Sequence, residues 1–247
     1  MRHEHFSTSE VPNHTKIRKY GYISYSLLES TKKENVDVIT FSGTGEPTLN
    51  SKIGEMIEFA KTFGFPVVTL TNSSTLLEPA VRAAICKADV VAAKLDAPNE
   101  EVFQKINRPI EGLKFKSILE GITKFRAEFR GKLVLQMMFA VENKERAREM
   151  ARLAEKIGPD EVQLNTPLRK PSEIPPLSKE EMDAVEKEFS TLPASISVVS
   201  IYELKRPEVK PIDVNETRAR RPSEGGDSNQ RGDRLSLLAV GNALRLH

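Results

Sequence analysis

Apolar residues change their spacing in a regular way between residues 36 and 165. Short apolar runs rich in Val, Ile and Ala alternate with longer segments in which apolar residues recur every three or four positions. A short run bounded by glycine, proline or asparagine is typical of a buried strand, and the longer period is typical of an amphipathic helix. The runs predict five strands, at 36–43, 65–74, 89–98, 132–141 and 159–167.

Helices are predicted between these strands, at 51–64, 78–88, 99–107, 113–131 and 143–158. After residue 165, Ser178 and Glu181 have the spacing of a capping box, which predicts a further helix, and one more strand is predicted at 195–205. Strands that are apolar nearly throughout indicate a parallel sheet covered by helices. The fold class is therefore α/β, and the strand count alone leaves open a β/α barrel or an open doubly wound sheet.

The two ends of the chain lack this alternation. Residues 1–35 form a divergent N-terminal segment with a weak helical pattern at 14–31, whereas 204–247 is polar and predicted to be largely disordered, with a terminal helix at 235–247 as an option. The predicted domain covers 36–203.

Composition excludes several classes of protein. The chain has 247 residues and a net charge of +2, which is too balanced to require a nucleic-acid partner. Its single cysteine, Cys86, cannot form an internal disulfide or hold a metal cluster alone, and we expect it to be a buried residue near a helix end. The terminal histidines His3 and His5 are expected to bind no metal. No apolar run is long enough to span a membrane and no signal peptide is evident, so a cytoplasmic location is expected.

Polar residues follow or end four of the first five predicted strands, and the fourth strand carries Gln136 near its middle. In parallel α/β sheets, ligands bind at the carboxyl ends of the strands, so these residues should meet at one edge. Any one of them is explained by a turn or a helix cap, but five on one edge favour a polar ligand that carries an amine and hydroxyls. A phosphate is a poorer match, because Pro47 follows the acid and no Walker-type GK[ST] segment occurs. The candidate residues are Gly43, Thr44, Gly45 and Glu46, then Asn72, Asp96, Gln136, Asn165 and Thr166.

Four segments carry a resemblance to a known family: SGTGEP at 42–47, KLDA at 94–97, INRP at 106–109 and VQLNTPLR at 162–169. With their surroundings they resemble the radical S-adenosylmethionine superfamily, in particular the Fe–S oxidoreductases related to the wyosine-tRNA synthases. The resemblance extends from about Val36 to about Tyr202. It implies a (β/α)6 TIM-like barrel that cleaves S-adenosylmethionine reductively to a 5′-deoxyadenosyl radical, acting on an RNA base or a small molecule.

The resemblance also implies roles for the candidate residues. The segment from Gly43 to Glu46 would hold the amino group of S-adenosylmethionine, which agrees with the ability of glycine to admit a ligand close to the backbone and of a carboxylate to accept from an ammonium. Asn72, Asp96 and Gln136 would face the cofactor or substrate, and Asn165 and Thr166 would lie near the adenine or ribose. Lys94 is expected to form an ion pair with Asp96 or Glu46, or to be catalytic.

The chain departs from the family before Val36. The family's [4Fe–4S] cluster needs a C-x3-C-x2-C loop, and no cysteine precedes Cys86. We therefore expect a partial barrel that lacks the first β/α unit, as in a truncated or frame-shifted family member, and that is inactive alone. The alternatives are a non-catalytic protein that binds S-adenosylmethionine or a nucleoside, a partner subunit, and a misfolded fragment. An open barrel edge would favour self-association.

Overall fold

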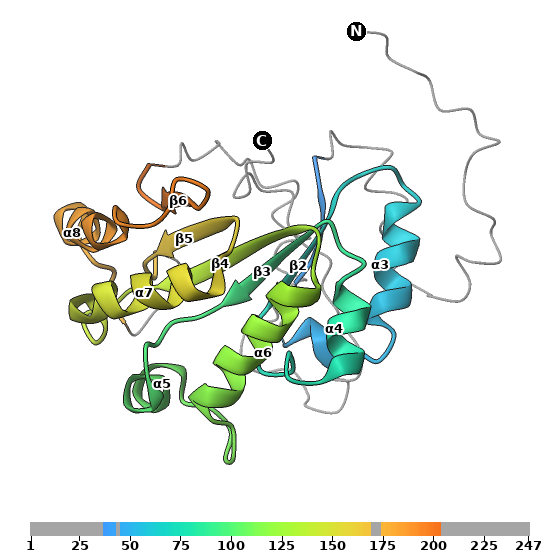
Figure 1. Ribbon diagram of the computed structural model, residues 1–247, viewed down its shortest axis with the longest axis horizontal. Helices are drawn as coiled ribbons and strands as arrows, with labels where there is room; N and C mark the ends of the chain where they lie inside the picture. The colour runs from blue at the N-terminus through green and yellow to red at the C-terminus, as the bar shows by residue number, and fades with distance from the viewer. Residues whose placement is uncertain (1–36, 43–44, 169–173, 204–247) are drawn as a thin grey trace, which may run out of the picture.

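The computed structural model describes residues 37–42, 45–168 and 174–203, and these form one α/β unit (Figure 1). Its sheet has six parallel strands that lie in chain order. The strands are β1 (Ile39–Phe41), β2 (Val67–Thr71), β3 (Val90–Lys94), β4 (Lys132–Met138), β5 (Glu161–Asn165) and β6 (Ser197–Ser200). All six were predicted, although each is shorter than its apolar run.

Helices occupy the predicted positions between the strands. They are η2 (Pro47–Leu49), α3 (Ile53–Lys61), α4 (Pro79–Ile85), α5 (Glu100–Asn107), α6 (Phe115–Glu128), η3 (Lys144–Arg146), α7 (Ala147–Ile157) and α8 (Lys179–Phe189). The capping box at the start of α8 is confirmed, since Ser178 and Glu181 exchange hydrogen bonds between side chain and backbone. None of the described helices is long and apolar enough to cross a membrane.

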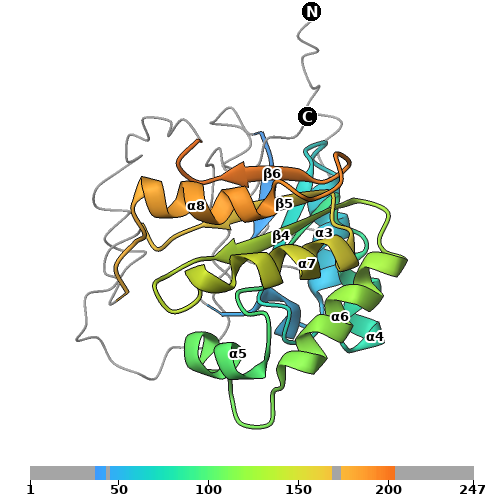
Figure 2. The ribbon, with the colours of Figure 1, turned by 60° about the vertical axis from the view of Figure 1, so that its left-hand side comes forward.

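The order of the strands decides between the two predicted architectures. A doubly wound sheet reverses its strand order and has helices on both faces. Here the order runs from β1 to β6 without reversal, and α6 and α7 lie on the same side of the sheet (Figures 1 and 2). The fold is therefore a partial TIM-like β/α barrel. Among the described residues β1 and β6 each have one neighbouring strand, so both ends of the sheet are open there.

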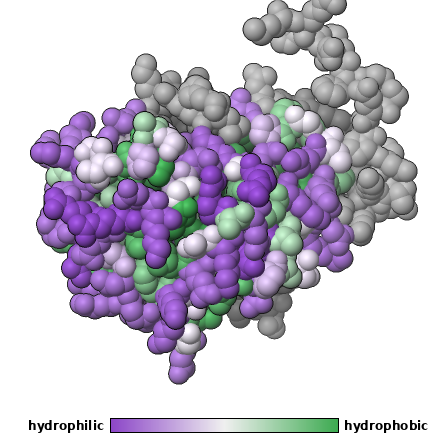
Figure 3. All heavy atoms as spheres, viewed as in Figure 1, coloured by the Kyte–Doolittle hydropathy of each residue, from purple (hydrophilic) through white to green (hydrophobic). Residues whose placement is uncertain are grey.

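The two faces of the sheet bury different residues because side chains alternate along each strand. One face packs against the helices in a large core that includes Val91, Leu135 and Val162. The opposite face has a small cluster of Val68, Val90, Ala92 and Val134, with no described helix in it. We call this second face the inner face. Figure 3 shows the helical side from outside, with apolar side chains in strips between hydrophilic ones.

Two aspartates tie neighbouring strands together at their amino ends. Asp89, just before β3, accepts a hydrogen bond from the backbone of Val67 at 2.8 Å and pairs with Lys61 of α3 at 2.7 Å. Asp160, just before β5, accepts from the backbone of Leu133 at 2.7 Å and pairs with Arg126 of α6 at 2.9 Å. The same device thus occurs twice, two strands apart, and fixes the end of the sheet opposite the candidate site.

Several predictions fall outside the described residues. They are the helix at 14–31, the missing first β/α unit, the disordered tail with its terminal helix, and the site residues Gly43 and Thr44.

Candidate functional site

The carboxylate of Glu46 is held at the carboxyl end of β2. Its Oε1 accepts hydrogen bonds from the backbone and hydroxyl of Thr48 at 3.2 and 2.6 Å and from the hydroxyl of Thr71 at 2.7 Å. Its Oε2 accepts from the backbone of Asn72 at 2.6 Å. Glu46 therefore caps η2 and fastens the loop after β1 to the next strand. This structural role explains why a carboxylate lies in the turn, whereas the neighbouring glycines and the proline explain only the turn itself.

Residues 71–74 form a tight turn in which the side chains of Thr71, Asn72 and Ser73 have hydrogen-bond partners. Asn72 is exposed, and its Oδ1 accepts from the backbone of Ser74 at 2.9 Å. Ser73 is buried in a left-handed conformation with φ of 69°, and its hydroxyl donates to the carbonyl of Lys94 at 2.9 Å. The turn thereby connects the end of β2 to the end of β3.

Asp96 is a buried carboxylate with three partners. Lys94 pairs with it at 2.9 Å, with 1% of the aspartate side chain and 44% of the lysine side chain exposed. Asn107, at the end of α5, donates to it at 3.1 Å, and the backbone of Met138 in β4 donates at 2.9 Å. The predicted ion pair of Lys94 is thus with Asp96, which satisfies the buried charge and holds the lysine at the rim.

Gln136 lies on the inner face and begins a row of polar side chains across β4 and β5. Its Nε2 donates to Oε1 of Gln163 at 2.9 Å, and Nε2 of Gln163 donates to Oε1 of Glu161 at 2.8 Å. Glu161 also pairs with Lys132 at 2.8 Å. Gln163 and Glu161 are buried, whereas Gln136 is half-buried.

The last two candidates, Asn165 and Thr166, differ in position. Asn165 ends β5 on the inner face, half-buried, and its carbonyl accepts from the backbone of Phe139 at 2.7 Å. Thr166 is buried, and its hydroxyl accepts from the backbone of Leu177 ahead of α8 at 2.8 Å. Thr166 therefore secures the connection to α8.

Hydrogen bonds link these residues along one edge of the sheet. The path runs from Glu46 to the turn after β2, from Ser73 to β3, and from Asp96 to Met138 in β4. Met138 is the register partner of Asn165 in β5. The expected meeting of five strand ends at one rim is thus present for the described residues.

The sequence prediction missed the polar row below Gln136 and the contact from Asn107 to Asp96. A signal for the row exists in the strand EVQLN, where Glu161, Gln163 and Asn165 alternate with apolar residues. That alternation indicates a polar face within a strand taken as fully apolar. The contact of Asn107 depends on the turn between β3 and α5, which no local pattern specifies.

Within the described residues, side chains that could hold a metal cluster do not gather at this rim. No group of three His, Cys, Asp or Glu side chains in the described parts of the chain is placed to bind a metal. Cys86 caps the end of α4, half-buried against the helical core, where burial and the nearby Glu128 raise the pKa of its thiol. A [4Fe–4S] cluster needs several cysteine thiolates, and Cys86 is the single cysteine of the chain, so its side chains do not fit such a cluster.

Three comparisons relate the chain to known proteins. The chain is 35% identical over 171 residues to the UPF0026 protein of Methanocaldococcus jannaschii, covering 65% of this chain and 53% of that protein. It is 32% identical over 215 residues to a Brachyspira hyodysenteriae protein named GTPase Obg, covering 83% of this chain and 32% of that protein. The crystal structure of Streptococcus suis SuiB bound to S-adenosylmethionine superposes with a TM-score of 0.57 at 12% identity, covering 81% of this chain and 45% of SuiB. The chain thus spans about half or less of each of these proteins.

The family assignment rests on a further match. The model described as the Radical SAM superfamily matches residues 24–154, more than half of the chain. This match agrees with the partial β/α barrel and with the order of its strands. The chain therefore belongs to the radical SAM superfamily.

Proposed function

We propose that the rim of this chain binds S-adenosylmethionine or a closely related nucleoside, with Glu46 as the acceptor for the ligand's amino group. The observation that carries the proposal is the fixed position of the Glu46 carboxylate. Four hydrogen bonds hold it, three on Oε1 and one on Oε2 among the described residues. Oε2 therefore keeps capacity for an ammonium, and Glu46 is half-buried rather than enclosed.

Space beside the carboxylate supports this proposal. Gly45 is exposed, and a Cβ added to it would meet no atom of the described residues within 4 Å. A ligand can therefore approach the backbone directly beside Glu46. Asn72, Asp96, Gln136 and Asn165 line or support the same rim and would face the cofactor or substrate. Thr166 is assigned a supporting role, because its hydroxyl is engaged with the segment before α8.

Cleavage of the bound molecule is a separate question. In the superfamily, a [4Fe–4S] cluster supplies the electron that cleaves S-adenosylmethionine reductively. The donor set of this chain does not fit that cluster, so we propose binding without cleavage by this chain alone, as a non-catalytic protein or a partner subunit. An RNA base or a small molecule as eventual substrate, and a cytoplasmic location, stay predictions. A nucleotide-hydrolase function is not proposed, because the sequence has no GK[ST] phosphate loop.

Anaerobic reconstitution with iron and sulfide tests the cluster part of this proposal. The expected result is protein without bound iron and without an absorbance band near 400 nm. A stable band that survives desalting, with stoichiometric iron, would show that the chain holds a cluster and would overturn it.

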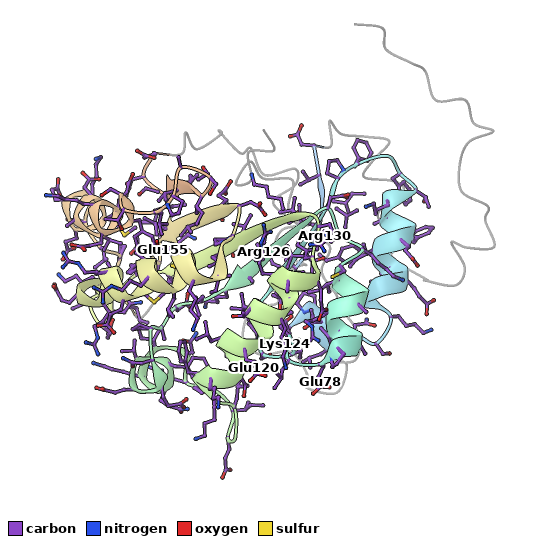
Figure 4. The ribbon with its side chains drawn as sticks, viewed as in Figure 1. Glu78, Glu120, Lys124, Arg126, Arg130 and Glu155 are labelled. Carbon is purple, nitrogen blue, oxygen red and sulfur yellow. The ribbon has the colours of Figure 1, made fainter. Side chains whose placement is uncertain are left out.

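Titration calorimetry with S-adenosylmethionine tests the binding part. We expect saturable binding by the wild-type chain and at least about tenfold weaker binding by Glu46→Gln, because the charge-assisted hydrogen bond to the ammonium is lost. The matched control is Glu155→Gln, an exposed glutamate on α7 on the helical side of the sheet (Figure 4). No binding by folded wild-type protein, or equal binding by wild type and Glu46→Gln, would refute the proposal.

A further inference from the structure

Three exposed apolar side chains lie at the end of the sheet that carries the candidate site. Leu49, Ile110 and Val141 are the exposed large apolar residues of the described part of the chain, with exposures of 74%, 79% and 56%. Leu49 ends η2 after β1, Val141 follows β4, and Ile110 lies between α5 and α6, which follow β3. Scattered apolar residues are common on protein surfaces, whereas a set confined to one end of a sheet is typical of an interaction surface.

The connection at 108–114, which we call the α5–α6 loop, is held at both ends. It projects from the lower edge of the molecule in Figure 1. Before the loop, Asn107 donates to Asp96 at the rim at 3.1 Å. After it, the backbone of Phe115 donates to Oε2 of Glu100 at 2.8 Å. The base of the loop is therefore fixed to the end of β3 and to the start of α5.

The backbone within the loop presents Ile110 in a defined conformation. Arg108 has a φ of 44° and Gly112 a φ of 86°, and both values lie in the left-handed region. For a non-glycine residue this conformation is costly and persists only where neighbouring contacts hold it. The backbone of Leu113 donates to the carbonyl of Ile110 at 3.2 Å and closes the turn. Because the backbone is fixed in advance, Ile110 loses little freedom when a partner binds.

Cations flank Ile110 within the loop and at its two ends. Between 105 and 116 they are Lys105, Arg108, Lys114 and Lys116, all exposed, and the one acid in this stretch is Glu111. None of the four cations forms an ion pair with a described residue. The surface around Ile110 thus carries positive charge that is available to an acidic partner.

The apolar residues favour a protein over a nucleic acid as that partner. Single-stranded RNA is bound on exposed aromatic side chains, on which its bases stack. No Phe or Tyr of the described residues is exposed, and the chain contains no Trp. Exposed aliphatic side chains beside cations instead match a protein surface in which apolar side chains are bordered by carboxylates.

We propose that the α5–α6 loop, together with Leu49 and Val141, is the docking surface for a partner protein whose apolar side chains are bordered by Asp and Glu. Ile110 is the central apolar contact. The hydrogen bond from Asn107 to Asp96 places this contact beside the candidate site. The inference rests on the partner-subunit part of the proposed function, and it holds whether or not the rim binds S-adenosylmethionine.

Relaxation of 15N-labelled protein tests whether Ile110 is fixed before binding. We expect backbone order parameters of about 0.85 at Ile110 and Glu111, close to those of α6, because the loop is held at both ends. Values below about 0.6 would show a flexible loop and would overturn the claim that the contact is preformed.

Photo-crosslinking in the cells that naturally produce the chain identifies the partner. The variants are Ile110→Bpa and Val141→Bpa, where Bpa is the photoreactive p-benzoylphenylalanine. The matched control is Glu155→Bpa, on the helical side of the sheet (Figure 4). We expect the first two variants to form an adduct with one and the same protein, and the control to form none with it. The crosslinked peptides, sequenced by mass spectrometry, should contain apolar residues bordered by Asp or Glu.

Affinity measurements with that purified protein test the contacts themselves. We expect Ile110→Ser to weaken binding at least about tenfold, because it removes an apolar contact at the centre of the interface. The double variant Lys105→Gln with Lys114→Gln should weaken binding less and should reduce its dependence on salt. Lys156→Gln, an exposed lysine on α7, is the control and should bind as the wild type does.

The outcomes separate this inference from ligand binding. No adduct at positions 110 and 141, an adduct with a second copy of this chain alone, or an adduct that ribonuclease removes would overturn the docking surface. Equal affinity of wild type and Ile110→Ser for the crosslinked protein would overturn it as well. Binding of S-adenosylmethionine is measured separately by calorimetry, so its failure leaves the docking surface in place. Ligand binding without an adduct refutes the docking surface alone.

Discussion

At the scale of single residues, the rim is built from polar groups that hold one another in place. Glu46 is an example, because the same carboxylate caps η2, anchors the turn after β2 and keeps capacity for a further hydrogen bond on Oε2. A group fixed in this way loses little freedom when a ligand binds. The bonds that stabilise the rim therefore also prepare it for a ligand.

Asp96 carries the first prediction at this scale. Replacing Asp96 with alanine removes the acceptor for Lys94, Asn107 and the backbone of Met138 at once. We expect the free energy of unfolding to fall by about 2–3 kcal/mol, because two neutral donors lose their partner in a buried position. Urea unfolding measures the change. The control is Asp183→Ala, which breaks an exposed pair with Lys179 on α8 and should cost less than about 0.5 kcal/mol. Equal costs for the two variants would contradict the structural role of Asp96.

At the scale of elements, the two ends of the sheet have different tasks. The carboxyl ends of the strands carry the candidate site. At the amino ends, Asp89 pairs with Lys61 of α3, and Asp160 pairs with Arg126 of α6, which is labelled in Figure 4. Each aspartate also accepts from a backbone amide of the strand beside it. Stability and binding are therefore separable by substitution.

The repeated aspartate device carries the second prediction. Asp89→Ala and Asp160→Ala should each lower the free energy of unfolding by about 1 kcal/mol, chiefly through the lost hydrogen bond to the strand, since both ion pairs are half-exposed. Because the two sites share no partner, the effects should add within about 0.5 kcal/mol in the double variant. Denaturant unfolding of the four proteins forms the double-mutant cycle. A large coupling energy would show that the two devices are not independent.

The start of α8 carries a prediction about pH. The hydrogen bond from Lys144, followed by the backbone of Ser178, lowers the pKa of Glu181 below its usual value. Because the pKa of Glu181 is lower in the folded state than in the unfolded chain, the ionised side chain stabilises the fold. This stabilisation is present above the pKa of glutamate in the unfolded chain, about 4.3, and is lost as the pH falls through the lower pKa of the folded state. Glu181→Gln keeps the capping geometry without the charge. The stability difference between wild type and Glu181→Gln should therefore shrink below about pH 4.3 in unfolding experiments. A difference that stays constant down to pH 3 would contradict this account.

At the scale of the whole molecule, the described sheet is an open partial barrel. Strands β1 and β6 each have one neighbouring strand in the described part of the chain, and an open parallel edge offers backbone groups to another chain. We predict self-association that increases with protein concentration, measured by sedimentation velocity. Val199→Lys places a charge on β6, where the side chain is half-buried, and should reduce this association. Monomeric behaviour of both proteins at all concentrations would show that these edges are not available.

Much of this architecture could be predicted from the sequence, because periodicity and end signals are local. The strands, the helices between them, and the cap of α8 at Ser178 follow from such signals. The hydrophobic pattern alone left the choice of a barrel open, since strand order is a non-local property, and the barrel was predicted from the family resemblance. The same limit applies to the site: the rim residues are predicted by their place after strands, whereas the contact from Asn107 to Asp96 and the row from Gln136 to Lys132 depend on how separate elements pack.

Binding of S-adenosylmethionine at the carboxyl-end rim can be mapped residue by residue. The measurement is the set of amide chemical shifts of 15N-labelled protein, recorded during titration with S-adenosylmethionine in the absence of iron. We expect the largest shifts at the strand ends, at Asn72, Ser73, Lys94 and Met138, and no change in the amides of Asp89 and Asp160 at the opposite end. Shifts confined to the amino ends or to the helical side of the sheet, or no shifts at saturating ligand, would contradict it.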